Sequence, residues 1–219
     1  MTPDLVIFDC DGVLVDSEII ACRVDARELG RLGFKLTVEE VAARFVGYKT
    51  QDMIDTLSAE QGIPVPEDFR DHILARVLTA FDSELTAVPN MARALEAIDR
   101  PVCVASSSDV PRIEHSLELT GLRRFFDERI FSAQMVARGK PFPDLFQLAA
   151  RSLRTPPETC LVIEDSVTGV KAGVAAGMRV LGFAGASHCL DGHGDRLRAA
   201  GAAEVFDDMA ELPGLIEAA

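Results

Sequence analysis

Short apolar runs of strand length alternate with helical segments along most of the chain, and this alternation restricts the fold to a few architectures. Strands are expected at Leu5–Phe8, Val102–Ala105, Arg129–Phe131, Leu161–Ile163, Val180–Phe183 and Glu204–Phe206. Helices are expected between several of them, at Pro111–Leu119, Asp144–Leu153 and Val167–Ala176. Repeated strand–helix units with right-handed crossovers predict an α/β fold with a doubly wound, Rossmann-like parallel sheet.

One long stretch, residues 17–86, interrupts the alternation because it carries helical signals only. Within it, Thr37 and Glu40 have the spacing of a capping box that opens a helix over Val38–Val46. We therefore predict an α/β core domain formed by residues 1–16 and 87–219, with a helical cap domain inserted at residues 17–86. A helical insertion after the first strand can act as a lid that closes over a ligand. The alternative is an ordinary helical subdomain without a role in catalysis.

The charge balance and the apolar pattern exclude several classes of partner. The 219-residue chain has a net charge of −13 and no compensating basic run, which argues against a nucleic acid partner. Its longest apolar stretches are of strand length, so no transmembrane helix and no membrane partner are expected. Five scattered cysteines and the lack of a secretory signal indicate free thiols in the cytoplasm. We expect a monomer or a weak dimer.

Two acidic residues, Asp9 and Asp11, follow the first predicted strand directly. Open α/β sheets bind their ligands at the carboxyl edge of the strands. Two carboxylates this close together stay ionised only if a cation lies between them, and otherwise one of them is protonated. The pair therefore predicts a magnesium site, an acid–base pair or both. The alternative is the common enrichment of acidic residues at a helix N-terminus.

The ends of three further strands carry matching polar groups. The turn Ser106–Ser108 offers a hydroxyl and helix N-terminal amides to a phosphate, although Ser108 can also serve as an ordinary N-cap. Lys140 is followed by two prolines at positions 141 and 143, which stiffen its loop in a way that a solvated lysine does not require. Glu164 and Asp165 offer hard oxygen ligands for magnesium, the alternative again being charge at a helix N-terminus.

Together these segments resemble the four motifs of the haloacid dehalogenase superfamily. The segments that carry the resemblance are Asp9–Glu18, the turn at Ser106, Lys140–Asp144 and Glu164–Gly169. The helical insertion after the first motif is similar to the subgroup with an α-helical cap, which includes β-phosphoglucomutase and many small-metabolite phosphatases. Within that subgroup, Arg44–Lys49 and Phe81–Leu85 look most like the 6-phosphogluconate phosphatase type. The resemblance covers essentially the whole chain.

The resemblance implies catalytic roles for residues of the core. Asp9 would be the nucleophile that forms an aspartyl-phosphate, and Asp11 would be the general acid and base. Ser106 and Ser107 would bind the transferring phosphoryl group together with neighbouring backbone N–H groups. Lys140 would pair with Asp9 and with a phosphate oxygen, and so balance the charge that develops in the transition state.

The resemblance also implies Mg²⁺ as the cofactor. The ion would be held by the Asp9 side chain, the Asp11 carbonyl and Asp165, with Glu164 close by. It would neutralise the negative charge of the phosphate oxygens and of the nucleophile. Asp9, Asp11, Glu164 and Asp165 are therefore the candidate metal residues, and the partner is a small-molecule phosphate ester.

Asp11 indicates an oxygen leaving group, because the dehalogenases of the family lack an acid at this position. The family's mutase has a cap histidine and a cap-loop arginine where this chain has Ala21 and Thr50. We therefore predict a magnesium-dependent phosphatase of a small sugar, sugar acid or polyol phosphate. The alternatives are a sugar phosphomutase and a non-catalytic phosphate-binding protein. Gly47 and Lys49 are the candidates for substrate recognition, unless Lys49 is an exposed loop lysine.

Two other features have simpler interpretations. His188, Cys189 and His193 lie close together in a Gly-rich segment after the fifth predicted strand, which favours a polar connecting loop over a metal site. Cys10 lies between the first two carboxylates. Because side chains alternate along a strand, Cys10 should point away from these carboxylates and pack in the core.

Overall fold

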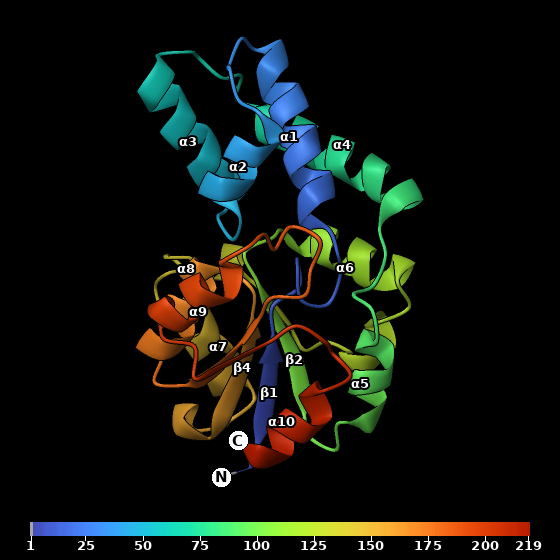
Figure 1. The fold of residues 1–219 in the computed structure, drawn as a ribbon. Coiled ribbons are helices and arrows are strands. Elements are labelled where there is room, and N and C mark those ends of the chain that lie inside the picture. The colour runs from blue at the N-terminus through green and yellow to red at the C-terminus, as the bar shows by residue number, and fades with distance from the viewer. Residues whose placement is uncertain (1) are drawn as a thin grey trace.

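The computed structural model describes residues 2–219 and shows an α/β core with a block of helices at one end (Figure 1). The core contains a six-stranded parallel sheet with the strand order β3-β2-β1-β4-β5-β6. Its strands are β1 (Leu5–Phe8), β2 (Val102–Ser106), β3 (Ile130–Ser132), β4 (Cys160–Glu164), β5 (Arg179–Phe183) and β6 (Glu204–Phe206). This topology confirms the predicted α/β fold with a doubly wound parallel sheet.

Helices cover both faces of the sheet, because successive side chains of a buried strand point to opposite faces. In β1, Val6 and Phe8 pack into one apolar cluster, which also contains Cys10, whereas Leu5 and Ile7 pack into the other. The first cluster is covered by α5 (Met91–Ala97), α6 (Val110–Leu119) and α10 (Leu212–Ala218), and the second by α7 (Asp144–Ser152), α8 (Val167–Ala175) and α9 (His193–Ala200). The core packing predicted for Cys10 is confirmed.

Four helices form the block: α1 (Glu18–Arg31), α2 (Val38–Phe45), α3 (Thr50–Gln61) and α4 (Phe69–Glu84). The block has an apolar cluster of its own, in which Leu29, Leu57 and Phe81 are buried. The predicted capping box is present, since the Thr37 hydroxyl accepts from the Glu40 amide and the Glu40 carboxylate accepts from the Thr37 amide. The block is therefore held together largely by contacts among its own helices.

The order of the strands determines where a ligand can bind. From β1 the chain continues to β2 and β3 on one side of the sheet, and it then crosses to β4, β5 and β6 on the other side. In open α/β sheets this reversal creates a crevice at the carboxyl ends of the strands, where ligands bind. The helical block lies over this end of the sheet, and the start of β1 and the C-terminus lie near the opposite end (Figure 1).

The strand bounds agree with the sequence-based prediction to within one residue at each end. The prediction omits α5, α9 and α10, which are short; α10 contains Pro213 and Gly214, and α9 contains Gly194. His193, expected in a connecting loop, is the first residue of α9. Short 3-10 helices, η1 (Arg123–Phe125), η2 (Ala133–Met135) and η3 (Pro157–Thr159), lie in the connections. Within residues 2–219, no helix combines the length and apolar character needed to cross a membrane.

Candidate active site

The carboxyl end of β1 carries Asp9, which is buried and paired with a lysine from a distant loop. Lys140 Nζ lies 2.8 Å from Asp9 Oδ1 and 2.6 Å from Glu164 Oε1, so one ammonium group joins the ends of β1 and β4. The Lys140 side chain is only 1% exposed, although the residue lies in a loop. Lys140 is therefore part of a buried ionic cluster rather than a solvated surface charge.

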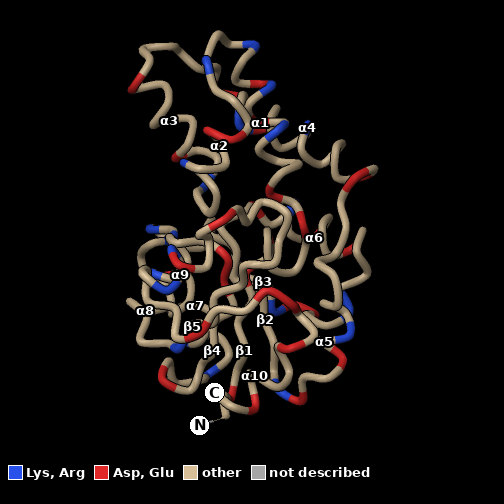
Figure 2. Tube along the Cα trace, in the orientation of Figure 1, with Lys and Arg blue, Asp and Glu red and all other residues tan. Residues whose placement is uncertain are grey.

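This cluster contains more negative than positive groups, because Asp9, Glu164 and Asp165 lie together there; elsewhere acidic segments are spread over the whole molecule (Figure 2). Burial raises the pKa of Asp9 well above its usual value; Lys140 opposes this, and Glu164 and Asp165 raise it further. Burial would lower the pKa of Lys140, but its two carboxylate partners outweigh that effect and raise it. These three carboxyl groups face two basic groups, the Lys140 ammonium and the His188 imidazole beside Asp165, which leaves negative charge that a further cation would neutralise.

The turn after β4 holds Glu164 in place. Glu164 Oε2 accepts hydrogen bonds from the amide and the hydroxyl of Ser166, each at 2.9 Å, while its other oxygen faces the lysine. The Ser166 hydroxyl also accepts from the Gly169 amide at 3.0 Å and caps α8. A Cβ at Gly169 would overlap the Glu164 carboxylate, so only glycine fits there. The same turn positions the next residue, Asp165.

Asp165 has the chemistry of a metal ligand. The residue is buried, and its Oδ1 has no hydrogen-bond partner within residues 2–219. Carboxylate oxygens of Asp9, Glu164 and Asp165 lie within 4.8 Å of one another. Buried polar atoms are costly when they stay unpaired, and grouped carboxylate oxygens are the hard ligands that Mg²⁺ prefers. The residues present therefore fit a magnesium ion.

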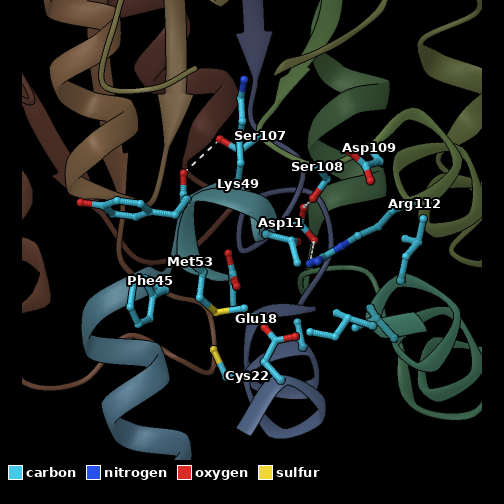
Figure 3. Close-up of a pocket in the computed structure, with 18 of the residues that line it drawn as sticks. Asp11, Glu18, Cys22, Phe45, Lys49, Met53, Ser107, Ser108, Asp109 and Arg112 are labelled. Atoms are coloured by element: carbon cyan, nitrogen blue, oxygen red, sulfur yellow. Dashed lines mark hydrogen bonds and ion pairs between the residues drawn. The ribbon is translucent and has the colours of Figure 1, made fainter. Parts of the chain in front are cut away.

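The Asp11 carboxylate has a different set of partners, in the cleft between the sheet and the helical block (Figure 3). Its Oδ1 accepts from the Ser17 hydroxyl and from Arg112 Nη2, each at 2.6 Å, and its Oδ2 accepts from the Ser108 hydroxyl at 2.5 Å. Burial would raise the pKa of Asp11, but Arg112 and the two hydroxyls outweigh it and lower the pKa. These partners hold Asp11 as a carboxylate.

Sequence patterns did not reveal two of these partners. Arg112 lies in the first turn of α6, and its side chain is 13% exposed and packs over the Phe81 ring of α4, 5.3 Å from its centroid. No spacing rule marks a helical arginine of this kind. Ser108, considered as a possible N-cap, binds Asp11 instead, and Asp109 occupies the N-cap position of α6.

The two serines predicted to bind phosphate have different surroundings. The buried Ser106 hydroxyl accepts a hydrogen bond from the Ser108 amide at 3.0 Å and lies 3.5 Å from Asp11 Oδ2. The Ser107 hydroxyl donates to the backbone carbonyl of Gly47, in the helical block, at 3.0 Å. Ser106 therefore lies beside the carboxylates, whereas Ser107 joins the core to the block.

The turn between α2 and α3 contacts the core at two further points. Gly47 has a φ of 82° and lies so close to Ser166 and Thr168 that a Cβ would be 2.7 Å from their side chains. The Lys49 side chain lies against Gly139. A Cβ added at Gly139 would be 2.6 Å from Lys49 Cε and 3.4 Å from Lys49 Nζ. Both predicted recognition residues thus belong to a turn that touches the sheet edge.

The cleft combines ionic groups from the core with a mixed wall from the block (Figure 3). The block side includes Glu18, Ala21, Cys22, Asp25, Phe45, Lys49, Thr50 and Met53. Burial raises the pKa of Glu18 to about 8 and that of Asp25 to about 7. Among the described residues, no histidine lines this cleft. Arg70 of α4 also lines the cleft, where it pairs with Asp109 of the core. The block therefore contributes two cations, Lys49 and Arg70, together with two acids of raised pKa and apolar surface.

His188 lies in the connecting segment that the sequence analysis expected, whereas His193 is the first residue of α9. Both are buried beside Asp165: His188 Nε2 lies 2.9 Å from Asp165 Oδ2, and His193 Nε2 lies 2.6 Å from the Asp165 backbone oxygen. Cys189 Sγ lies 3.6 Å from His188 Nε2. Sequence spacing does not reveal the contacts with Asp165, because His193 is 28 positions away from it along the chain and only folding brings the two together.

Comparison with known proteins gives consistent matches over most of the chain. Residues 3–177 match the model of the haloacid dehalogenase-like hydrolase family. The 6-phosphogluconate phosphatase of Escherichia coli (strain K12) is 35% identical over 216 residues, which span 98% of this chain and 95% of that protein. A haloacid dehalogenase-like protein of unknown function from Agrobacterium tumefaciens str. C58 has a crystal structure with a TM-score of 0.83 at 39% identity, covering 98% of both chains. A HAD family hydrolase from Deinococcus radiodurans R1, with bound phosphate and sodium, has a TM-score of 0.74 at 36% identity, covering 99% of this chain and 96% of that one.

Proposed function

The chain belongs to the haloacid dehalogenase-like hydrolase family, and from this premise we propose that it hydrolyses a small phosphorylated metabolite through an aspartyl-phosphate on Asp9. The observation that supports this most strongly is the buried pairing of Asp9 with Lys140 at the floor of a cleft. Lys140 favours the carboxylate form of Asp9, which is the form that attacks phosphorus. Phosphoryl transfer depends mostly on positioning and electrostatics, and a fixed ionic cluster provides both.

We assign Asp11 as the general acid and base. Its carboxylate, held by Arg112 and two hydroxyls, is the form that activates water in the second step. The negative charge of a bound phosphoryl group raises the pKa of a neighbouring carboxyl, so substrate binding favours the protonated form that the leaving oxygen needs. Ser106, 3.5 Å from Asp11, would bind the phosphoryl oxygens, with Ser107 at the edge of the same turn.

We assign Mg²⁺ as the cofactor, bound by the side chains of Asp9 and Asp165 and by the Asp11 backbone carbonyl. Glu164 lies beside this position, and both of its carboxylate oxygens already have partners. When bound, the ion neutralises charge on the phosphate oxygens and on the nucleophile. The buried Oδ1 of Asp165, which has no partner in residues 2–219, supports this assignment.

We further propose that residues 17–86 form a cap domain over a core of residues 1–16 and 87–219, and that the cap selects the substrate. Lys49 would pair with a carboxylate or a second anionic group, and Gly47 allows its turn to approach the core. The substrate class is a sugar, sugar acid or polyol phosphate. A sugar acid is supported by the 6-phosphogluconate phosphatase of E. coli, whose name specifies such a substrate.

A phosphomutase is less well supported. Such an enzyme needs a cap group that handles a proton of the sugar, whereas Ala21 occupies the candidate position and no described histidine lines the cleft. Thr50 lines the same cleft, and the family resemblance pairs it with the cap-loop arginine of the mutase, a charge that threonine lacks.

The proposal is tested by measuring orthophosphate release from p-nitrophenyl phosphate and from a panel of sugar, sugar acid and polyol phosphates. We expect turnover that requires Mg²⁺ and stops when EDTA is added. No release from any ester at saturating Mg²⁺ would favour a phosphate-binding protein instead. Formation of an isomeric sugar phosphate that depends on a bisphosphate would favour a mutase.

A further inference from the structure

Two histidines from one segment contact the same aspartate, and the proposed chemistry leaves them without a role. His188 lies in the connection between β5 and α9, and His193 is the first residue of α9. His188 Nε2 is 2.9 Å from the Asp165 carboxylate, and His193 Nε2 is 2.6 Å from the Asp165 backbone oxygen. The segment therefore contacts both the side chain and the main chain of Asp165.

The two carboxylate oxygens of Asp165 have different neighbours. Oδ2 forms an ion pair with His188 at 2.9 Å, whereas Oδ1 has no such contact, and within residues 2–219 neither oxygen has a partner with hydrogen-bond geometry. A carboxylate with one oxygen held by an imidazole has a fixed orientation, and its second oxygen then points in one direction only. This arrangement is common for metal ligands, which are oriented by partners outside the coordination sphere.

His188 and Asp165 are packed closely together in the interior. Their side chains are 3% and 1% exposed, and the rings of His188 and His193 meet edge to face with centroids 5.6 Å apart. Gly12, with a φ of 78°, closes the other side, because a Cβ there would overlap Asp165 and lie 2.8 Å from His188 Cε1. Only glycine leaves room at position 12 for this pairing.

We propose that His188 is a positioning residue that holds Asp165 for the catalytic cation, with His193 fixing the main chain behind it. This inference rests on the magnesium site of the proposed function. His188 touches neither substrate nor cation in this account; it acts through the orientation of Asp165. Its effect should therefore be seen first in metal affinity.

The same segment could instead bind a metal ion of its own, since His188, Cys189 and His193 lie close enough to share one. The contacts favour the positioning role. Nε2 of each histidine faces Asp165, and His193 Nδ1 lies 3.1 Å from Arg196 Nη2, so both nitrogens of His193 have partners. His188 Nδ1 has no partner in residues 2–219, but a cation bound through the Nε2 atoms would have to displace both contacts with Asp165.

The test measures the dissociation constant of Mn²⁺ by electron paramagnetic resonance, which requires no turnover. We compare the wild-type protein with His188→Ala, which removes the donor, and with His188→Gln, which can still donate to Asp165. Leu190→Ala is the matched control, because Leu190 belongs to the same segment and is 68% exposed. Circular dichroism and thermal melting establish that each variant is folded.

We expect His188→Ala to weaken Mn²⁺ binding by about 10- to 100-fold, as loss of an outer partner of a metal ligand does elsewhere. His188→Gln should retain part of the Mn²⁺ affinity that His188→Ala loses, and Leu190→Ala should bind Mn²⁺ as tightly as the wild type. An unchanged constant in folded His188→Ala would overturn the proposal, as would an equal loss in Leu190→Ala. Wild-type protein that binds no Mn²⁺ would overturn the metal assignment itself. Phosphatase activity is measured in a separate assay, so failure of the proposed function can be told apart from failure of this inference.

Discussion

The carboxyl edge of the sheet and the helical block face each other across one cleft, but they are held in very different ways. At the sheet edge, Lys140 joins Asp9 to Glu164 in a buried ionic cluster. Breaking such a buried pair costs about 3–5 kcal/mol. Between block and core, by contrast, the contact of His115 with Asp82 is exposed, and exposed pairs contribute about 0–1 kcal/mol; a second pair, Arg70 with Asp109, is only partly buried. The proposed chemistry thus lies on a buried ionic frame, whereas the proposed recognition lies on a block whose ion pairs with the core are exposed or only partly buried.

Asp9→Asn is the most severe test of the contrast between the sheet edge and the block, because it removes the assigned nucleophile and keeps the side-chain shape. If the sheet edge performs the chemistry, kcat should fall by about 10⁴-fold or more, because the amide cannot form the covalent intermediate that is assigned to Asp9. Phosphate release from p-nitrophenyl phosphate measures this, with circular dichroism as the control for folding. Activity within tenfold of the wild type would remove Asp9 from its assigned role.

Lys140→Met tests whether the rigid frame depends on its single buried ammonium group. We expect kcat to fall by about 10²- to 10³-fold, since the charge that stabilises the transition state is lost. The free energy of unfolding should also fall by about 3 kcal/mol, because two buried carboxylates lose their partner. Kinetics and urea denaturation measure the two effects. Lys171→Met, at an exposed lysine of α8, is the matched control and should change neither.

The two regions also differ in how far the sequence predicts them. Asp9, Lys140 and Asp165 were predicted as site residues because each lies at a strand end or on a proline-stiffened loop, and parallel strands bring their carboxyl ends together. Arg112 and His188 were missed because they reach the site only through tertiary packing, which no periodicity encodes. The helices of the block were predicted by their patterns, whereas the contact of its α2–α3 turn with the core depends on how the block docks.

Lys49→Ala tests whether the block, rather than the sheet edge, selects the substrate. If Lys49 pairs with an anionic group, kcat/KM for 6-phosphogluconate should fall by about tenfold relative to a neutral sugar phosphate, which corresponds to about 1.4 kcal/mol. Competition assays with the two substrates give this ratio directly. Lys35→Ala, at an exposed lysine of the same block, should leave the ratio unchanged. An equal ratio in both variants would exclude Lys49 from substrate selection.

Glu28→Gln tests the stability of the block separately from the site. Glu28 is 1% exposed and contacts Arg31 at 2.6 Å and His72 at 3.0 Å. Burial would raise its pKa, but hydrogen bonds from these partners and from Arg27 outweigh it and lower the pKa to about 2. We expect the substitution to lower the free energy of unfolding by about 1–2 kcal/mol near neutral pH, with kcat/KM unchanged.

The pH dependence of this effect has a defined direction. Because folding depresses the pKa of Glu28, its stabilisation is complete above the unfolded value of about 4.3 and is lost as the pH falls from there towards 2. Urea denaturation at several pH values should therefore show wild type and Glu28→Gln converging in acid. Glu60→Gln, which breaks an exposed pair with Arg44, should cost no more than about 0.5 kcal/mol. A constant difference down to pH 2 would contradict the assigned pKa.

The central claim, that the sheet edge carries a covalent nucleophile, is tested most directly by trapping the intermediate. The enzyme is mixed with substrate and quenched in acid, the acyl phosphate is reduced with borohydride, and the modified peptide is identified by mass spectrometry. The account predicts modification at Asp9 in the wild-type protein and none in Asp9→Asn. Modification at Asp11 instead, or turnover without a trapped intermediate under conditions that trap one in a control aspartyl-phosphate enzyme, would contradict it.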